Sequence, residues 1–381
     1  MSIAAPQDFA PRVVAWQRLH GRHGLPWQGT RDAYRIWLSE IMLQQTQVAT
    51  VLRYYGPFLR RFPTVADLAQ ASADEVMALW SGLGYYSRAR HLHACAQAVV
   101  KSHGGVFPTD AVVLESLPGI GRSTAAAVAA FSSGQRGAIL DGNVKRVLAR
   151  HRAFGEDLSK PAGVRSLWAL AEALLPSNDI EPYTQGLMDL GATVCTLRRP
   201  ACGGCPVQAD CAAHALGRPQ DFPVKTRRVQ RGRRESHLLL ALWTAGAEGL
   251  APVRVEPQVL LEQRSPTGIW SGLWTLPVFD DEAQLRQWMG RCGLEETAPL
   301  KSLAAVEHAL THLDWTLRPR AIQVRQARQA GAMATQPLPA RAACARWVPL
   351  SEALKRGLPA PVRRLLEDVD AAGDRSVFAD Y

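Results

Sequence analysis

The chain has 381 residues, of which 47% are hydrophobic and 20% charged, and its formal net charge is +10 at pH 7. This length suffices for two domains with separate cores, and the basic excess favours a polyanionic partner such as nucleic acid. No signal peptide is found, and no run reaches the ~20 apolar residues of a membrane span, which predicts a cytoplasmic protein with no membrane partner. The seven cysteines favour a metal site or free thiols over disulfides.

Up to about residue 215, the chain is predicted to be entirely helical. Ser72 opens a capping box and Asp110 precedes a further helix, which are both signals of a helix start. No stretch in this half has the alternating pattern of a strand. Helical periodicity covers residues 8–20, 34–43, 48–59, 164–175 and 182–192, and a further helix ends near residue 100.

A glycine-rich turn at residues 117–121 is the clearest functional signal in this half. Gly119 and Gly121 leave backbone N–H groups accessible, and the turn opens onto a helix whose first turn carries Ser123 and Thr124. Backbone donors at a helix N-terminus bind anions such as phosphate. The turn therefore predicts a site that binds the phosphates of a nucleic-acid backbone.

Two acidic residues could divide the chemistry of breaking an N-glycosidic bond. Such a reaction needs an acid to protonate the leaving base and a carboxylate to stabilise the cationic sugar. Glu40 lies in an apolar helix, where burial raises a carboxyl pKa and keeps the group protonated. Asp141 follows the turn by twenty residues, but an Asp before Gly-Asn is also a common helix N-cap.

Four cysteines form the pattern C-x6-C-x2-C-x5-C at Cys195, Cys202, Cys205 and Cys211. Their compact spacing favours a [4Fe–4S] cluster, because four thiolates in one loop can surround it. A zinc ion is the alternative, since the central Cys-x2-Cys pair also suits zinc and His214 could complete the site. The spacing alone leaves both possibilities open.

The composition changes after residue 217. Residues 218–235 are rich in arginine and contain two prolines, which predicts a basic linker, either a solvated hinge or a further phosphate contact. Beyond it, an α+β domain with a mixed or antiparallel sheet is predicted over residues 236–370. Its predicted strands are residues 238–243, 259–263, 273–278, 321–324 and 345–350, and its predicted helices are residues 282–292 and 362–369.

Taken together, these stretches resemble the MutY family of adenine DNA glycosylases, which belongs to the helix-hairpin-helix superfamily of base-excision enzymes. The resemblance is strong over residues 8–215 and weaker beyond. Residues 268–277 also match the family's G-x-W-x-G-L-W-x-x-P signature in a Nudix-like domain. The motifs that carry the resemblance are residues 25–27, 39–47, 82–90, 117–125 and 140–147, together with the four cysteines.

The resemblance implies a multidomain protein and assigns roles at the reacting bond. It implies an all-α helix-hairpin-helix catalytic domain over residues 1–217, with its hairpin at about 110–133 and a [4Fe–4S] cluster on the four cysteines. It further implies that Glu40 protonates adenine N7 and later helps to place water. Asp141 would stabilise the sugar cation, directly or as a transient ester, and Asn143 would support this site.

Ser123 bears on the reaction type. Related endonuclease III–type enzymes carry a lysine at this position, which attacks the sugar as a Schiff-base nucleophile and cleaves the strand. A serine hydroxyl cannot form an imine, so we expect a monofunctional glycosylase that leaves an intact abasic site. Lys145 is close in sequence, but on its helix we expect it to face solvent or phosphate.

The resemblance also implies a set of DNA contacts, because the target base must be flipped out of the duplex. Gln45 and Tyr85 match residues that wedge into the stack around the opposite base, with Thr46 and Leu83 as their neighbours. Arg88 would steady that loop or bind a phosphate, and Trp27 and Gln28 correspond to the family's adenine-pocket region. The full set of expected DNA contacts is Trp27, Gln28, Gln45, Thr46, Leu83, Tyr85, Arg88, Gly119, Gly121, Ser123, Thr311 and His312.

In the second domain, residues 308–312 resemble the family's H-x-F-[ST]-H loop, which inspects 8-oxoguanine. Leu310 stands where the family has Phe, which puts intercalation in doubt, whereas Thr311 and His312 keep polar contacts possible. Residues 280–286 lack the acidic R-E-x-x-E-E helix that holds magnesium in Nudix hydrolases. The domain is therefore expected to recognise a lesion and not to hydrolyse nucleotides.

The predicted function is hydrolytic removal of adenine mispaired with 8-oxoguanine or guanine. The expected partner is double-stranded DNA carrying such a mispair, bound by a monomer associated with the nucleoid. Two alternatives are an endonuclease III–like lyase acting on oxidised pyrimidines and a non-catalytic iron–sulfur DNA-binding protein. Ser123 and the C-terminal domain favour the adenine glycosylase over the lyase.

Overall fold

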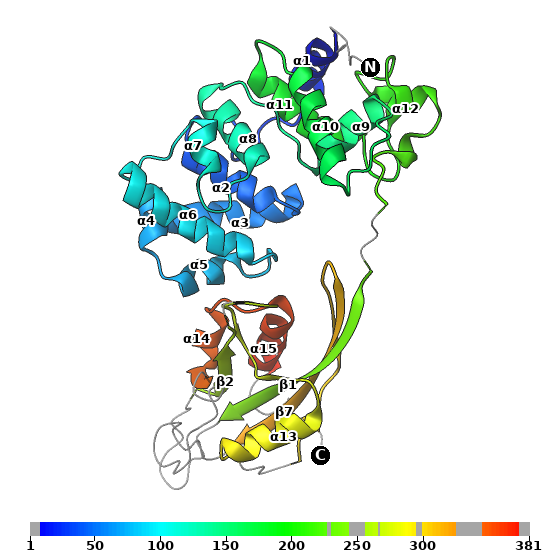
Figure 1. Cartoon of the computed structure of the whole chain (residues 1–381). Coiled ribbons are helices and arrows are strands. Elements are labelled where there is room, and N and C mark those ends of the chain that lie inside the picture. Colours follow the sequence, from blue (N-terminus) through cyan, green and yellow to red (C-terminus); the bar gives the residue numbers. More distant parts are fainter. Residues whose placement is uncertain are drawn as a thin grey trace. The chain divides into compact units, whose positions relative to one another are not determined.

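A computed structural model describes residues 8–226, 230–243, 256–265, 267–294, 299–324 and 345–372 of the chain (Figure 1). The chain divides into two compact units. The first comprises Met1–Gln70 and His91–Arg228, and the second comprises Ala71–Arg90 and Val229–Tyr381. Within the described residues, no helix has both the length and the apolar character needed to cross a bilayer.

The described part of the chain up to residue 226 contains helices and no strand, which confirms the all-α prediction. The helices are α1 (Phe9–His20), α2 (Ala33–Leu43), α3 (Val48–Arg61), α4 (Val65–Gln70), α5 (Ala73–Trp80), α6 (Ser87–His103), α7 (Ala111–Glu115), α8 (Arg122–Ser133), α9 (Gly142–His151), α10 (Pro161–Ala173), α11 (Ile180–Asp189) and α12 (Ala212–Ala215). Two short 3-10 helices, Cys202–Gly204 and Pro219–Asp221, lie among them.

Side-chain caps and a run of small residues explain how these helices form and pack. The predicted caps are present, because the Ser72 hydroxyl accepts the Glu75 N–H and Asp110 accepts the N–H groups of Val112 and Val113. In α8, all six residues from 125 to 130 are Ala or Val and are buried. Such small side chains allow α2 to pack closely against this helix.

The predicted helix at residues 182–192 changes type before its end. α11 begins at Ile180 and is followed by a π-helical turn, η1 (Leu190–Val194). The Cys195 N–H donates to the Leu190 carbonyl at 2.7 Å, which is the i to i+5 spacing of such a turn. π-Turns of this kind are frequent at functional sites, and this one leads directly into the first cysteine of the loop.

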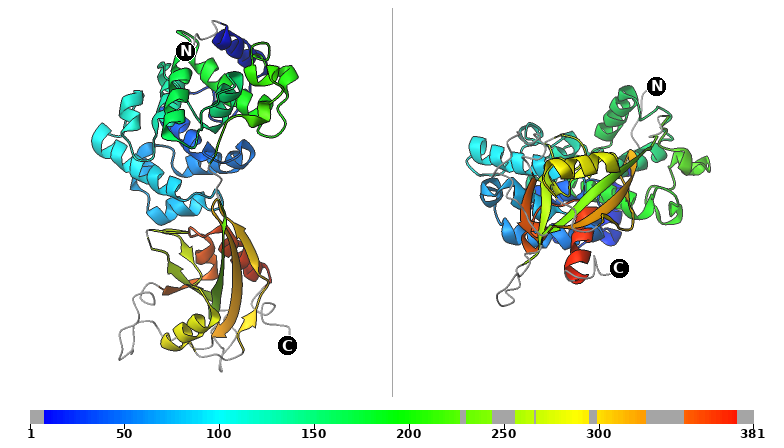
Figure 2. Two further views of the ribbon diagram at one scale, coloured as in Figure 1. Left: turned by 45° about the vertical axis from the view of Figure 1, so that its right-hand side comes forward. Right: turned by 90° about the horizontal axis from the view of Figure 1, so that it is seen from below.

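The second unit contains a mixed sheet, as predicted for this half. β1 (Gly232–Trp243) runs parallel to β7 (Leu313–Val324) and antiparallel to β2 (Gln258–Gln263). α13 (Glu282–Arg291) and α15 (Ala360–Ala372) lie on different sides of the sheet (Figures 1 and 2). The other elements are β3 (Trp274–Thr275), β4 (Val278–Phe279), β5 (Lys301–Ser302), β6 (Val306–Ala309), β8 (Ala345–Pro349) and α14 (Leu350–Leu354).

Each predicted strand corresponds to an observed one, with differences in extent. The predicted strand at residues 273–278 is split into β3 and β4, with Pro277 in the break. β6 was not predicted because its four residues are alternately exposed and half-buried and carry no apolar pattern. It forms a hairpin with β7, in which His308 pairs with Trp315.

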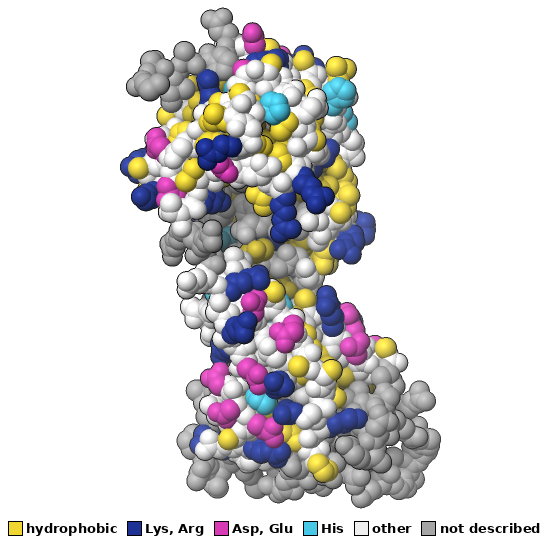
Figure 3. Space-filling model, turned by 90° about the vertical axis from the view of Figure 1, so that its right-hand side faces the viewer, with side chains coloured by type: hydrophobic (Ala, Val, Ile, Leu, Met, Phe, Trp, Pro, Cys, Tyr) yellow, Lys and Arg dark blue, Asp and Glu magenta, His cyan; other side chains and the backbone are white. Residues whose placement is uncertain are grey.

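The basic segment after residue 217 is partly fixed to the first unit. Arg150 Nε donates to the Phe222 carbonyl at 3.2 Å, and the Thr226 hydroxyl donates to the Asp157 carboxylate. β1 already begins at Gly232. On the face shown in Figure 3, Lys and Arg side chains are dispersed among Asp and Glu. Arg227 and Arg228, which belong to the predicted linker, lie outside the described residues.

Candidate active site

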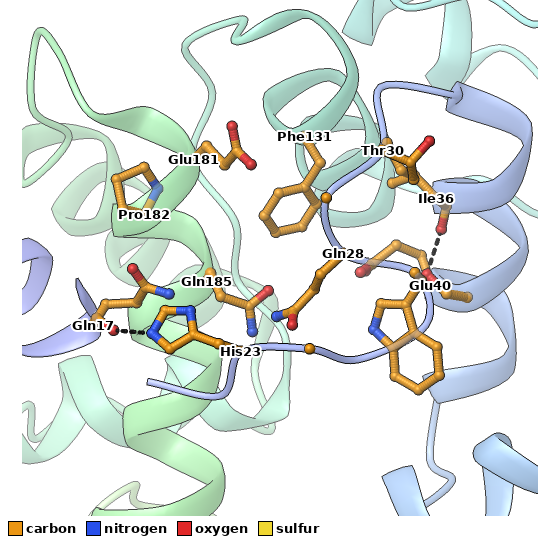
Figure 4. Close-up of a pocket in the computed structure, with 14 residues that line it drawn as sticks. Gln17, His23, Gln28, Thr30, Ile36, Glu40, Phe131, Glu181, Pro182 and Gln185 are labelled. Atoms are coloured by element: carbon orange, nitrogen blue, oxygen red, sulfur yellow. Dashed lines mark hydrogen bonds between the residues drawn. The ribbon is translucent and has the colours of Figure 1, made fainter. Parts of the chain in front are cut away.

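A pocket of about 350 Å³ in the first unit is bordered by α2, α11 and the loop that precedes α2 (Figure 4). Glu40 projects into it from α2, and Trp27 and Phe131 supply apolar surface. The amide side chains of Gln28 and Gln185 face each other across it in Figure 4. The lining thus combines aromatic surface with several polar side chains, which suits a small, flat molecule with polar edges such as a base.

Glu40 is positioned by the burial of its own helix. Ile36, Trp37 and Ile41 are each no more than 3% exposed, so α2 is anchored and the half-buried Glu40 faces the pocket. Burial, and to a lesser extent the charge of Asp141, raises the pKa of Glu40 from 4.5 to about 8. The carboxyl group is therefore protonated at neutral pH and can donate a proton. The upward direction of this pKa shift is the one that the apolar neighbours of Glu40 predict.

Asp141 caps a helix, and its charge acts on Glu40. Its Oδ1 accepts the Val144 N–H at 2.8 Å, which makes Asp141 the N-cap of α9. Burial raises the pKa of Asp141, although the backbone N–H groups of Val144 and Asn143 oppose that rise. The charge of Asp141 contributes to the raised pKa of Glu40, so the two predicted carboxyl groups interact electrostatically. Asp141 can therefore be both the N-cap of α9 and a candidate catalytic carboxylate.

Ser123 holds the turn that carries Asp141. Its Oγ, in the first turn of α8, accepts the backbone N–H of Leu140 at 2.9 Å. Leu140 directly precedes Asp141 and is itself buried. Lys145 lies in α9, where its N–H donates to the Asp141 carbonyl as part of the helix.

Asn143 is fixed from two sides. Arg146 Nη2 donates to Asn143 Oδ1 at 2.9 Å, while Arg146 Nε donates to the Cys195 carbonyl at 2.7 Å. Gly191, in the π-turn η1, leaves no room for a side chain, because an added Cβ would lie 2.5 Å from Asn143 Cβ. Arg146 therefore connects the Asp141 helix to the cysteine loop.

The turn before α8 has the geometry of an anion site. Gly119 has a φ of 77°, and a Cβ there would lie 2.5 Å from His91 Cβ, so only glycine fits. The buried side chains of Leu117 and Ile120 anchor the turn. Gly121 is the N-cap of α8, whose first N–H groups have no partner within the helix.

Comparison with known proteins agrees with this geometry. The family model described as HhH-GPD superfamily base excision DNA repair protein matches residues 38–173, and a NUDIX domain model matches residues 251–368. The chain is 36% identical to the adenine DNA glycosylase of Mus musculus, over 85% of this chain and 72% of the mouse protein. It is 41% identical to that of Mycobacterium tuberculosis, over 58% of this chain and 73% of the relative.

The chain belongs to the adenine DNA glycosylase family. The glycosylase family model covers part of the first unit and also Ala71–Arg90 of the second, whereas the NUDIX model lies within the second unit. Among solved structures, a thermostable thymine-DNA glycosylase is 28% identical, with a TM-score of 0.49 over 55% of this chain and 95% of that protein.

In this family member, two residues expected at the opposite base have strained backbones. Gln45 and Tyr85 have φ angles of 56° and 48°, in the left-handed region that side chains rarely adopt. Such strain persists where the surrounding structure enforces it and is frequent at functional sites. Gln45 follows α2 in the first unit, with Thr46 beside it, while Tyr85 belongs to the second unit. Trp27 and Gln28 line the pocket that Glu40 enters.

The loop that carries Tyr85 is supported from beneath. Arg88 is buried and donates to the carbonyls of Leu83 and Gly84, each at 3.2 Å, so it steadies the loop. Leu83 is only 5% exposed and serves as the loop's anchor, whereas Tyr85 is 45% exposed. Within the second unit, the Tyr85 hydroxyl lies 3.2 Å from Thr311 Oγ1.

The loop at residues 308–312 connects β6 to β7. The Leu310 N–H donates to the Leu313 carbonyl at 2.7 Å, which closes a tight turn. Thr311 and His312 are exposed at its tip, while Leu310 is half-buried. The described geometry thus leaves the two polar side chains accessible.

The four cysteines line one small cavity together with Arg150 and His214. Burial raises the pKa of Cys205 to about 11, and the nearby thiols of the other three cysteines add to this rise. The Arg150 guanidinium lies 3.4 Å from Cys195 Sγ. Four clustered thiols next to a cation fit a large anionic group such as [4Fe–4S]. In the described residues, no group of three or more His, Cys, Asp or Glu side chains is arranged as a site for a metal ion.

Several residues at the site were not found from the sequence. Arg146 and Arg150 were overlooked because each is one arginine among many in a basic chain. Asp189 and Gln185 lie one turn apart on α11. An acid at position 189, between apolar residues of a helix that is otherwise buried, is the one signal that could have marked this pair.

Proposed function

We propose that the chain hydrolyses the N-glycosidic bond of adenine mispaired with 8-oxoguanine, and less efficiently with guanine, and leaves an abasic site. The observation that carries the proposal is the pair of carboxyl groups, in which Glu40 has a pKa of about 8 beside the acidic Asp141. Adenine DNA glycosylases of several organisms are the relatives that support this substrate. The protein would act as a monomer on nucleoid DNA.

The reaction follows from the protonation states of these two groups. Adenine flipped into the pocket receives a proton on N7 from Glu40, which makes the base a better leaving group. As the bond to the sugar breaks, the Asp141 carboxylate stabilises the positive charge that develops at the anomeric carbon. Glu40, now deprotonated, can accept a proton from the attacking water. Asn143, held by Arg146, orients the turn that bears Asp141.

The proposed reaction stops at the abasic site. Ser123 uses its hydroxyl to hold Leu140 and has no amine with which to form an imine. Endonuclease III–like cleavage is therefore the less favoured function. A non-catalytic DNA-binding role would not require an acid with the raised pKa of Glu40.

Recognition of the mispair is assigned to the residues that matched the family motifs. Gly119 and Gly121 would bind the phosphate backbone, and Gln45 and Tyr85 would enter the base stack around the opposite base. Thr311 and His312 would contact 8-oxoguanine, and the Tyr85–Thr311 contact supports a shared surface within that unit.

The four cysteines are proposed to hold a [4Fe–4S] cluster. When bound, the cluster supplies a rigid, charged centre that fixes the loop at residues 195–211. Arg146 and Arg150 then tie this loop to α9 by bonds to Cys195 and Thr196. A brown protein with about four irons per chain is expected, and bound zinc in its place would contradict the assignment.

One assay separates the three candidate functions. Labelled duplexes that carry 8-oxoguanine:A, G:A or an oxidised pyrimidine are incubated with the protein and analysed with and without alkali. Breakage of the adenine strand only after alkali is the expected result. Breakage without alkali would contradict the monofunctional reaction, and cleavage at the oxidised pyrimidine would support the endonuclease III–like alternative. Inertness on all duplexes would leave only DNA binding.

A further inference from the structure

Residues 71–90 lie within the segment that the glycosylase model matches, yet they pack as part of the second unit. They comprise α5 and the loop that follows it. An added Cβ at Gly357, between α14 and α15, would lie 2.7 Å from Met77 Cβ on α5, so the two segments approach closely. Trp274 Nε1 also donates to the Asp74 carboxylate at 3.1 Å. The segment that the NUDIX model matches therefore contacts α5 directly.

Ser81 fixes the start of the Tyr85 loop, the segment between α5 and α6. Its hydroxyl donates to the Leu358 carbonyl at 2.7 Å and accepts from Arg363 Nε at 3.0 Å. Ser81 is only 8% exposed, and Leu358 is fully buried. The Tyr86 hydroxyl donates to the same Leu358 carbonyl at 3.3 Å. Side chains from both sides of Tyr85 thus share one backbone acceptor.

Arg363 joins the Tyr85 loop to the turn between α14 and α15. Besides its bond to Ser81, the guanidinium donates to the carbonyls of Leu354 and Arg356 at 2.8 and 3.0 Å. Each of its three nitrogens therefore has an acceptor. Because the guanidinium is a rigid planar group, these bonds fix its orientation and the position of the Ser81 hydroxyl.

A second contact holds the chain just beyond the Tyr85 loop. Arg90 Nη1, in the first turn of α6, donates to the Ser271 carbonyl at 2.8 Å. Ser271 is 3% exposed, and its neighbour Trp270 donates from Nε1 to His308 Nε2 at 3.4 Å. His308 begins the loop at residues 308–312. The same short turn therefore contacts both segments that are expected to meet the opposite base.

These contacts keep Tyr85 beside the loop at residues 308–312, where its hydroxyl lies 3.2 Å from Thr311 Oγ1. The backbone of Tyr85 has a φ of 48°, and such strain persists only where the surrounding structure enforces it. The bonds of Ser81 and Arg90, on either side, supply that enforcement. 8-Oxoguanine differs from guanine only at C8, which carries an oxygen, and at N7, which carries a hydrogen. Discrimination between them requires polar groups held at a fixed spacing.

We propose that Ser81 and Arg363 are positioning residues that hold Tyr85 against the loop at residues 308–312 and so set the preference for 8-oxoguanine over guanine opposite the excised adenine. The inference rests on the proposed function, which supplies the mispair. Neither side chain needs to touch DNA, because both act through the backbone and hydroxyl contacts of the Tyr85 loop.

The first test is amide hydrogen exchange of the full chain without DNA. In Arg363→Met and in Ser81→Ala, the hydrogen-bonded N–H groups of Leu83 and Arg88 should exchange about fivefold faster or more, as expected for loss of one hydrogen bond. Lys355→Met is the matched control, since it removes an exposed cation from the same turn, paired only with Glu352 at 2.7 Å, and should leave the exchange unchanged.

The second test compares single-turnover excision of adenine opposite 8-oxoguanine and opposite guanine. The ratio of the two rates should fall about fivefold or more in Arg363→Met and in Ser81→Ala, and should not change in Lys355→Met. The variant with both changes should lose no more than the more affected single variant, because the two residues act through one bond.

Unchanged exchange in both folded variants would overturn the inference. Equal rate losses on the two duplexes, or faster exchange with an unchanged rate ratio, would also contradict it. If Arg363→Met does not fold, Ser81→Ala decides the test, because it removes only a hydroxyl group. Failure of the proposed function is a different result, since the unaltered protein would then excise adenine from neither duplex.

Discussion

The hydroxyl oxygen of Ser123 accepts the backbone N–H of Leu140 at 2.9 Å, across the gap between the start of α8 and the residue before Asp141. Ser123, which stands where the related lyases are expected to carry lysine, thus fixes the backbone of a neighbouring segment. It connects the hairpin that is proposed to bind phosphate to the turn that carries a candidate catalytic carboxylate. A lysine at this position could not accept that hydrogen bond, because its ammonium group only donates.

Replacing Ser123 by Ala should therefore slow adenine excision without creating strand cleavage. Loss of one buried hydrogen bond corresponds to about 1 kcal/mol, or a rate reduction of about five- to tenfold if the Asp141 turn shifts. Single-turnover rates with and without alkali measure both effects. Ser132→Ala is the matched control, since that hydroxyl bonds only within α8, to Val128. Equal rates for the two variants would show that the Ser123 bond does not position Asp141.

The rate of adenine excision should fall as the pH rises through about 8. Glu40 acts as an acid only while protonated, and burial raises its pKa to about 8. The rate should therefore be nearly constant just below that value and decrease about tenfold per unit well above it. Measurement of single-turnover rates from pH 6 to 10 tests this. In Glu40→Gln the rate should be low and independent of pH over that range, and a persisting decline would assign the titration to another group.

Glu40 should also make the fold less stable as the pH rises. In the unfolded chain its pKa is near the ordinary 4.5, whereas burial raises it to about 8 in the folded protein. The folded state therefore binds more protons between these values, so stability present below pH 4.5 is lost progressively as the pH rises toward 8. Glu40→Gln removes this loss. Its melting temperature relative to the unaltered protein should be higher at pH 9 than at pH 5, and the opposite order would contradict the raised pKa of Glu40.

Asp141→Asn should abolish excision and leave folding and DNA binding nearly intact. Asn caps helices about as well as Asp, so the bond to the Val144 N–H persists and α9 remains stable. The amide carries no charge to stabilise the sugar cation. We therefore expect the excision rate to fall about 10³-fold or more, as when other groups that stabilise charge in a transition state are removed. Turnover at an unchanged rate would remove Asp141 from the mechanism, while a large drop in melting temperature would mean that the charge is needed for the fold.

Local patterns account for what the sequence could predict. The caps at Ser72, Asp110 and Asp141 and the periodicity of the helices depend on residues within one turn of each other, and the structure confirms them. The raised pKa of Glu40 followed from its apolar neighbours on the same helix.

Contacts between distant segments could not be predicted in this way. Arg22 and Asp189 are 167 positions apart, and Arg146 and Gly191 are 45 apart. Each pair meets only because α11 and its π-turn pack beside α9 and the loop before α2. No local signal marks such a pair, since each partner alone is an ordinary charged residue or glycine.

Arg146→Met should weaken both the active site and the cysteine loop. The guanidinium bridges Asn143 Oδ1 and the Cys195 carbonyl, so its loss leaves Asn143 Oδ1 without its donor and the Cys195 carbonyl with only the longer bond from Arg150 Nη1, at 3.5 Å. We expect at least a tenfold lower excision rate and faster loss of iron during dialysis against a chelator. Arg18→Met, which removes only an exposed ion pair with Asp179, is the matched control. If the rate falls while iron is retained, Arg146 acts through Asn143 alone. If neither changes, the bridge has no functional role.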